Sequence, residues 1–144
     1  MNRILKTLEE EGFIHRASFA TKRYFIEERS LQKTLKKSGY LALYNVGIRY
    51  CFMLVLKYGY DIRENMVHIA FKNILKVVLR VDHRLSSEIV KTRHAIKYNS
   101  GVADPTTTSC LKKIIDELSS LCMIEGQNSE FEKLGIAQIE IVKK

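Results

Sequence analysis

The stretch LALYNVGIRYCFMLVL, residues 41–56, is the feature that most limits how this chain can fold. Drawn as an α-helix, it is apolar around almost its whole circumference, which is typical of a helix enclosed by other elements. It is shorter than the roughly 20 residues that a bilayer-spanning helix needs, and Asn45 and Arg49 interrupt it. We therefore expect a buried central helix of a soluble protein at about 41–58, closed by Gly59, and no membrane partner.

The rest of the chain offers few places to turn, because 144 residues contain only one proline and seven glycines. Apolar residues recur at helical spacing in several further segments. Gly12 follows the first of these segments, and Asp104 and Pro105 form the pair that favours a helix start. We expect a short helix before Gly12 and longer helices over about 21–37, 64–80, 83–98 and 105–125.

These segments predict an all-α fold, an antiparallel helical bundle of four long core helices with shorter flanking helices. The stretch FIHRAS, 13–18, should be extended or irregular between the first two helices. We assign residues 1–125 to one helical domain and residues 126–144 to a C-terminal tail. Ala137, Ile139 and Ile141 alternate with polar residues there, so the tail forms either a short strand or a docking helix.

Cysteines give no indication of a disulfide framework or of a metal site. Cys51, Cys110 and Cys122 are odd in number, and the sequence has no CxxC motif and no Cys/His cluster. The opening MNRILKTLEEEG contains three consecutive glutamates and does not resemble a secretory signal. We expect a cytoplasmic protein without a metal or cofactor.

Positive charge is concentrated in the first two thirds of the chain. The net charge is +8, and residues 1–100 carry 19 Lys and Arg against 9 Asp and Glu. Residues 101–144 carry 5 against 7. This distribution suits a polyanionic partner such as RNA, although a basic surface also serves solubility.

Three polar residues do not fit their surroundings. Arg49 lies one helical turn after Asn45 inside the most apolar helix, and an unpaired buried guanidinium is costly by several kcal/mol. These two residues should face a carboxylate, a second subunit or a ligand, unless the long side chain of Arg49 reaches solvent from an edge. His68, in the first turn of the next helix, either contributes to a site or bonds to a neighbouring loop.

The octapeptide TRHAIKYN, 92–99, crowds cations, an imidazole and a phenol onto one short segment. On a helix that points Leu85, Ile89, Thr92 and Ile96 inward, the outward face carries the polar group of Lys91, Arg93, His94, Lys97 and Tyr98. Such a strip attracts phosphate, and its residue types are adequate for metal-free RNA cleavage. The alternative is an ordinary solvated helix face.

Several segments taken together resemble the HEPN superfamily (higher eukaryote and prokaryote nucleotide-binding domain), in particular its small stand-alone bacterial and archaeal members. LKTLEEEGFIHRASF, 5–19, is similar to the opening of those proteins, a short helix ending in a glycine–hydrophobic pair. LQKTLKKSGYLALYNVGIRYCFMLVLKYGYDIRENMVHIAF, 31–71, resembles their helical hairpin with its aromatic-rich second helix. KTRHAIKYNSGV, 91–102, matches the place of the family's arginine, and the likeness covers about residues 3–124.

The resemblance implies a homodimer in which two subunits assemble one metal-independent ribonuclease site from an arginine and a following histidine. Arg93 occupies the arginine position, but Tyr98 stands where such members carry the histidine. His94 is adjacent to Arg93 and points about 100° away from it on a helix. A tyrosine hydroxyl ionises at too high a pH to serve as a general base at neutrality, so activity depends on how the groups assemble.

We therefore predict a HEPN-like dimer that binds RNA or a nucleotide, and as a more specific hypothesis a metal-independent ribonuclease that serves as a toxin or effector with a cognate antitoxin. The alternatives are a non-catalytic partner of a nucleotidyltransferase, a helical protein–protein interaction module and, more distantly, a winged-helix DNA binder. The predicted catalytic residues are Arg93, His94 and Tyr98. The predicted RNA- or nucleotide-binding residues are Asn45, Arg49, His68, Lys91 and Lys97. We further expect Asn45, Arg49, Arg93 and Tyr98 to line one groove.

Overall fold

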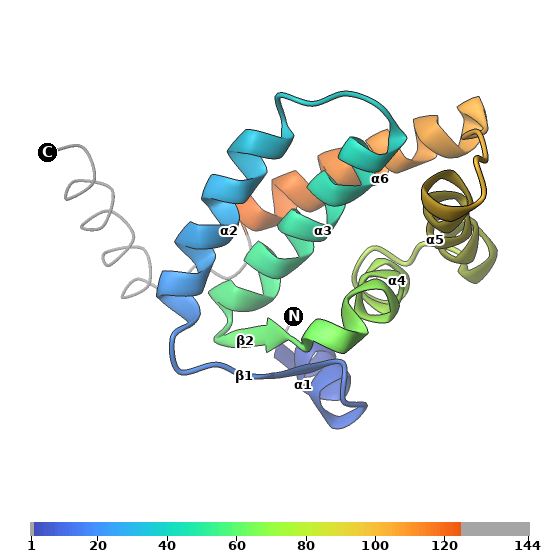
Figure 1. The fold of residues 1–144 in the computed structure, drawn as a ribbon. Helices are drawn as coiled ribbons and strands as arrows, with labels where there is room; N and C mark the ends of the chain where they lie inside the picture. Colours follow the sequence, from blue (N-terminus) through green and yellow to red (C-terminus); the bar gives the residue numbers. More distant parts are fainter. Residues whose placement is uncertain (1, 125–144) are drawn as a thin grey trace, which may run out of the picture.

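A computed structural model describes residues 2–124 of the chain, and Figure 1 shows their arrangement. Most of these residues are helical. The elements in chain order are α1 (Asn2–Glu10), β1 (Ile14–Arg16), α2 (Ala20–Thr34), α3 (Tyr40–Lys57), β2 (Tyr60–Ile62), the 3-10 helix η1 (Glu64–Met66), α4 (Val67–Val78), α5 (His83–Tyr98) and α6 (Pro105–Ile124). The predictions for the tail, 126–144, fall outside the described residues.

The apolar segment predicted to be central does form the middle of the fold. α3 packs against four other helices, α2, α4, α5 and α6. Figure 1 shows α2, α3 and α6 lying side by side, with α4 and α5 set beyond α3. Burial follows from this position, because the side chains of Tyr44, Cys51, Leu54 and Leu56 are fully enclosed. The predicted mostly helical fold is therefore confirmed.

A two-stranded sheet is the departure from an all-α fold. β1 pairs antiparallel with β2, with Ile14 opposite Ile62 and Arg16 opposite Tyr60. The sequence predicts extended or irregular chain over 13–18 but no strand after Gly59. Gly59 has φ 86°, a conformation that disfavours side chains, and it lets the chain reverse from α3 into β2. Ile14 and Ile62 are both buried, so pairing the strands also covers the lower end of the core.

The predicted start of the last long helix is confirmed in detail. The backbone N–H of Thr106 donates to Asp104 Oδ1 at 2.7 Å, which is the bond expected of an N-cap aspartate. Pro105 is the first residue of α6, as the sequence predicts. Leu111, Ile114 and Leu118 from the apolar stripe of α6 then enter the core.

A glycine on α3 allows α3 and α4 to pack closely. Gly47 lies on α3 opposite the ring of Phe71 on α4, and a Cβ at Gly47 would stand 3.0 Å from that ring. Tyr44 makes an edge-to-face contact with the same ring, with centroids 5.0 Å apart. A larger residue at 47 would push α4 outward, so this glycine sets the distance between the two helices.

Two parts of the predicted interior differ from expectation. The helix expected over about 21–37 ends at Thr34, so Leu35 stands after the end of α2 and is 50% exposed. Glu27 and Ser86, which the apolar pattern did not select, are buried. Within residues 2–124, no helix combines the length and hydropathy required to cross a membrane.

Candidate functional site

The outward face of α5 carries the polar strip that the sequence singles out. α5 turns Ile89 and Thr92 into the core, so its opposite side is free for charged residues. Arg93 is half-buried, whereas His94, Lys97 and Tyr98 are exposed. Helical spacing of four residues places Arg93 beside Lys97 and His94 beside Tyr98. The strip therefore exists as predicted on one helix.

Tyr98 is the centre of this strip. The guanidinium carbon of Arg93 lies 6.0 Å from the centre of its ring, and Lys97 Nζ lies 5.4 Å from it. The ring of His94 is also close, with centroids 4.8 Å apart. Cations attracted by the ring face are held in place without losing their charge. Tyr98 thus orders two cations while remaining 59% exposed itself.

A second aromatic ring supports Arg93 from inside the molecule. The guanidinium lies 5.9 Å from the ring centre of Tyr44, a fully buried residue of α3. The hydroxyl of Tyr44 shares a hydrogen bond of 2.9 Å with Nδ1 of His68 on α4. Three helices therefore meet at Arg93. We call the six residues joined in this way the Arg93 cluster: Tyr44, His68, Arg93, His94, Lys97 and Tyr98.

Burial favours the neutral form of both members of the Tyr44–His68 pair, and the neighbouring cations favour it further for His68 only. Partial burial, then Arg93, then Lys97 lower the pKa of His68. Burial raises the pKa of Tyr44 well above its usual range, although Arg93 acts in the opposite direction. When the Tyr44 hydroxyl donates to Nδ1, Nε2 of His68 carries the hydrogen and can donate to an anion.

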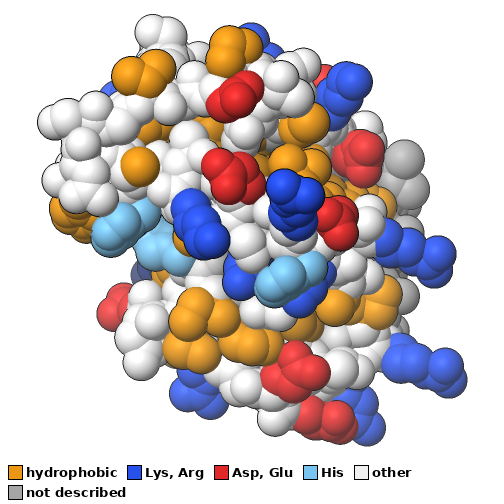
Figure 2. Space-filling model, turned by 90° about the vertical axis from the view of Figure 1, so that its right-hand side faces the viewer, with side chains coloured by type: hydrophobic (Ala, Val, Ile, Leu, Met, Phe, Trp, Pro, Cys, Tyr) orange, Lys and Arg blue, Asp and Glu red, His pale blue; other side chains and the backbone are white. Residues whose placement is uncertain are grey.

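The cations of the cluster have no carboxylate partner in the described part of the chain. The ion pairs of residues 2–124 join Arg16, Arg23 and Arg49 to acidic residues, and none includes Arg93 or Lys97. Figure 2 shows histidine side chains next to Lys and Arg on the face that α4 and α5 present, with carboxylates spaced around them. An arriving anion would therefore meet positive charge that is not already neutralised.

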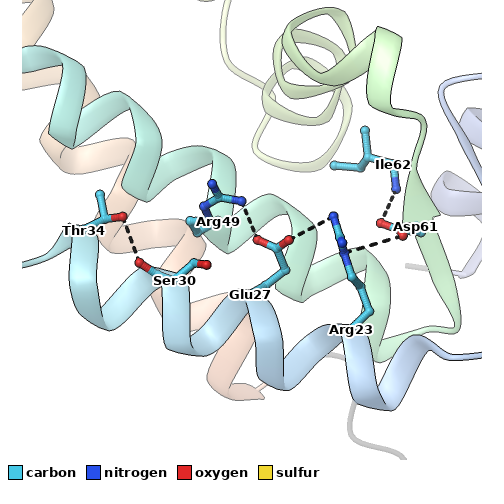
Figure 3. Close-up of polar contacts among 7 residues, drawn as sticks. All are labelled: Arg23, Glu27, Ser30, Thr34, Arg49, Asp61 and Ile62. Carbon is cyan, nitrogen blue, oxygen red and sulfur yellow. Dashed lines mark hydrogen bonds and ion pairs between the residues drawn. The ribbon is translucent and has the colours of Figure 1, made fainter.

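Arg49 belongs to a different group of residues, between α2 and α3. Its Nη1 lies 2.7 Å from Oε2 of Glu27, a carboxylate whose side chain is only 3% exposed. Arg23 Nη2 lies 3.2 Å from the other oxygen of Glu27, and Arg23 Nε lies 3.8 Å from Asp61. Figure 3 shows the two arginines approaching Glu27 from opposite sides. The sequence left open whether Arg49 faces a carboxylate, a second subunit, a ligand or solvent, and in the structure it faces the carboxylate of Glu27.

The structure therefore divides the predicted site residues. It brings His68, Arg93, His94, Lys97 and Tyr98 together. Asn45 is exposed on α3, Lys91 is exposed on α5, and Arg49 is paired with Glu27. Within residues 2–124, no hydrogen bond, ion pair or ring contact links these three to the cluster. Arg49 therefore belongs to the group around Glu27, and the single groove expected for Asn45, Arg49, Arg93 and Tyr98 stays a prediction.

Sequence reasoning missed Tyr44, which connects α3 to the cluster. Tyr44 stands in the apolar run 41–56, where a tyrosine is as consistent with core packing as with a site. A buried tyrosine hydroxyl needs a hydrogen-bond partner, and this requirement was the only indication in the sequence that Tyr44 lies beside another polar residue. The partner, His68, is 24 residues further along the chain, so only the packing of α4 on α3 identifies it.

The arrangement suits an anion with an attached ring. Arg93 and Lys97 supply unmatched charge, and Tyr98 supplies an exposed ring face. His68 can add a hydrogen-bond donor when the Tyr44 hydroxyl donates to its Nδ1. In the described residues, no three His, Cys, Asp or Glu side chains are grouped so as to hold a metal ion.

Comparison of the sequence and the fold with known proteins finds no relative of this protein. No family model matches the sequence, no curated protein matches it, and no solved structure matches the fold.

Proposed function

We propose that this protein binds RNA or a nucleotide through the Arg93 cluster, as a HEPN-like homodimer. The observation that carries the proposal is the unmatched charge of Arg93, which lies near the rings of Tyr44 and Tyr98, and of Lys97, which lies near the ring of Tyr98. Arginine and lysine without carboxylate partners bind phosphate, and an exposed tyrosine stacks on a base. The net charge of +8 favours the approach of a polyanion.

The dimer is part of this proposal because the cluster has apolar surface at its borders. Ile69, which follows His68 on α4, is 50% exposed. A second copy that covers this surface would place two clusters around a shared axis and double the density of positive charge. RNA would then lie across both copies, which agrees with the arrangement that the HEPN resemblance implies.

RNA cleavage is the activity that this assembly would support. In the cleavage step, the 2′-oxygen attacks phosphorus, the bond to the 5′-oxygen breaks, and the products are a 2′,3′-cyclic phosphate and a 5′-hydroxyl. A base removes the 2′-proton, an acid returns a proton to the 5′-oxygen, and cations balance the charge of the phosphorane. Arg93 would stabilise that charge, and His94 and Tyr98 stand beside it on the same helix.

Binding is tested with a short fluorescent single-stranded RNA and the full-length protein. The Arg93→Gln/Lys97→Gln variant should bind this RNA at least tenfold more weakly, about 1.4 kcal/mol or more. Its affinity should also depend less steeply on salt, because fewer counterions are displaced. Light scattering on the same samples measures whether the protein is a dimer.

The matched control is Lys33→Gln/Lys113→Gln, which removes two exposed charges from α2 and α6. Equal weakening by both variants would mean that net charge, and not the cluster, attracts RNA. Binding that survives in Arg93→Gln/Lys97→Gln would reject the proposal. The far-ultraviolet circular dichroism of each variant shows whether its helices are intact.

A non-catalytic binding protein, such as the helper of a nucleotidyltransferase, is the second candidate. The observation in its favour is Tyr98, which stands where the catalytic HEPN members carry a histidine. Incubation of a labelled RNA without metal separates the two candidates. Cleavage that disappears in Arg93→Ala supports the ribonuclease, whereas binding without cleavage supports the helper.

A further inference from the structure

A cavity of about 440 Å³ lies where the loop after α2 meets the start of α3 and the first half of α6. None of its lining residues belongs to the Arg93 cluster. Its volume falls within the range of small-molecule sites in proteins. The wall is mainly apolar and consists largely of the side chains of Leu35, Tyr40, Leu43, Val46, Ala103 and Ile115.

Part of this apolar wall is left open to water. Leu35 is 50% exposed although it lines the cavity, and Leu43 and Ala103 are only partly buried. Filling the space with an apolar group would remove this surface from water, which is favourable in proportion to the area covered. The hydroxyl of Tyr40 is already bonded to the carbonyl oxygen of Ile89 at 2.7 Å, so this wall residue offers mainly ring surface.

Two lysines give the cavity a positive charge. Lys37 and Lys112 both line it, one from the loop after α2 and the other from α6. In the described part of the chain, neither lysine forms an ion pair, and the lining includes no carboxylate. Thr108, another polar lining residue, donates its hydroxyl to the backbone carbonyl of Asp104. The charges at the cavity are therefore of one sign and unmatched.

The first turn of α3 adds to the positive charge at the cavity. Gly39, Tyr40 and Ala42 of this turn line the cavity, and no side chain caps the helix start. The free N–H groups at a helix start carry partial positive charge. This contribution adds to the two lysines and does not replace them.

We propose that this cavity binds an amphipathic monocarboxylate, with an aliphatic chain of medium length against the apolar wall and the carboxylate at Lys37 and Lys112. An inorganic anion would leave the apolar wall exposed, and a neutral chain would leave both lysines unmatched. Only a ligand with both parts satisfies the whole lining. This proposal is independent of RNA binding, because it uses none of the residues of the Arg93 cluster.

The test is calorimetric titration of the full-length protein with octanoate, with acetate and octan-1-ol as probes of the two halves. Octanoate should bind saturably at one site per chain. Acetate and octan-1-ol should each bind about tenfold more weakly or worse, because each lacks half of the interactions. Amide resonances of Gly39 and Ala103, which line the cavity, should shift when octanoate is added.

The decisive variant is Lys37→Glu/Lys112→Glu, and the matched control is Lys36→Glu/Lys113→Glu. The control reverses the charge of the neighbouring exposed lysines, which do not line the cavity. We expect the first variant to lower octanoate affinity about tenfold or more, the size expected when two partly exposed ion pairs become repulsions, and the control to change it little.

The possible results separate cleanly. Absence of saturable octanoate binding to the wild-type protein would overturn the proposal, as would equal losses in the two lysine variants. Octan-1-ol binding as tight as octanoate would also overturn it, because the lysines would then have no role. Thermal unfolding of both variants verifies that the loss does not come from misfolding.

Discussion

Arg49 and Arg93 project from α3 and α5, two helices that pack against each other, but their charges are met in different ways. Arg49 lies 2.7 Å from the carboxylate of Glu27, which is enclosed between α2 and α3. Arg93 lies within about 6 Å of the ring centres of both Tyr44 and Tyr98, and no carboxylate of residues 2–124 is paired with it. Arg49 neutralises a buried carboxylate, whereas the charge of Arg93 is not neutralised by a carboxylate of residues 2–124.

This difference separates stability from function. A buried carboxylate such as Glu27 is costly unless cations neutralise it, so Arg23 and Arg49 make its position tolerable. Aromatic rings, in contrast, fix an arginine while leaving its hydrogen-bond donors free. In the sequence, both arginines looked like candidate site residues. Their neighbours show that an arginine becomes a binding candidate when its charge is unmatched.

The largest effect should follow from breaking the internal charge balance. Arg49→Met leaves Glu27 buried with Arg23 as its remaining partner. We expect the free energy of unfolding to fall by about 2–3 kcal/mol, below the full cost of a deeply buried pair because a third of Arg49 is exposed. Urea denaturation measures this change, and RNA affinity should stay within about twofold of wild type.

A second substitution sharpens the same prediction. Glu27→Leu/Arg49→Met removes the buried carboxylate together with its partner, so it should be more stable than Arg49→Met alone. If the double variant is the less stable of the two, the loss in Arg49→Met arises from packing and not from an unbalanced charge.

The opposite pattern is expected at the Arg93 cluster. Arg93→Gln should weaken RNA binding about tenfold, equal to about 1.4 kcal/mol, because one unmatched cation is lost. Its unfolding free energy should change by less than about 1 kcal/mol, since no ion pair is broken. Fluorescence anisotropy and urea denaturation of one preparation measure both quantities. A large loss of stability with unchanged affinity would reverse the roles assigned to Arg49 and Arg93.

A smaller effect is expected at the hydrogen bond that links α3 to α4. Tyr44→Phe keeps the buried ring but removes the hydroxyl that is bonded to His68 Nδ1. The unfolding free energy should fall by about 1 kcal/mol, the usual net contribution of one such bond. His68→Phe, which removes the other partner, should add little further loss in the Tyr44→Phe background. Additive losses in the double variant would show that the two residues act independently.

The smallest effect concerns pH. Burial, Arg93 and Lys97 lower the pKa of His68, so the folded protein takes up this proton less readily than the unfolded chain does. The stability linked to His68 is therefore complete above the unfolded pKa of histidine and is lost as the pH falls through the lowered folded pKa.

An anion bound at Arg93 and Lys97 would partly screen them and raise the pKa of His68 again. RNA affinity should then rise severalfold as the pH falls through the same window, and binding should take up protons. Calorimetry in buffers of different ionisation enthalpy measures that uptake. His68→Gln should remove the part of the pH dependence that belongs to this residue, and an unchanged profile would exclude His68 from the site.

Local pattern was sufficient to predict most of the helices. Asp104 and Pro105 identify the start of α6, because a cap and a restricted proline act within one turn. Gly12 and Gly59 lie where α1 and α3 end, as the sequence indicates. The apolar run 41–56 identifies the central helix. Strand β2 was missed because three residues carry too little pattern, and only pairing with β1 makes them a strand.

The candidate site was half predictable. Arg93, His94, Lys97 and Tyr98 share one helix, so helical spacing alone places them together. Tyr44 lies on another helix, and no periodicity links it to Arg93. Glu27 was equally hidden, since a glutamate in a charged helix is usually exposed.

Local residue pattern was enough to locate most of the helices, to identify the central one and to mark the polar face of α5, because these features depend on neighbours within a few residues. Tertiary structure alone decided which charges are matched. Arg49 meets Glu27 across 22 positions, and Tyr44 meets His68 across 24. The energy of a charge depends on the atoms that surround it in space, and those atoms come from elements that only packing brings together.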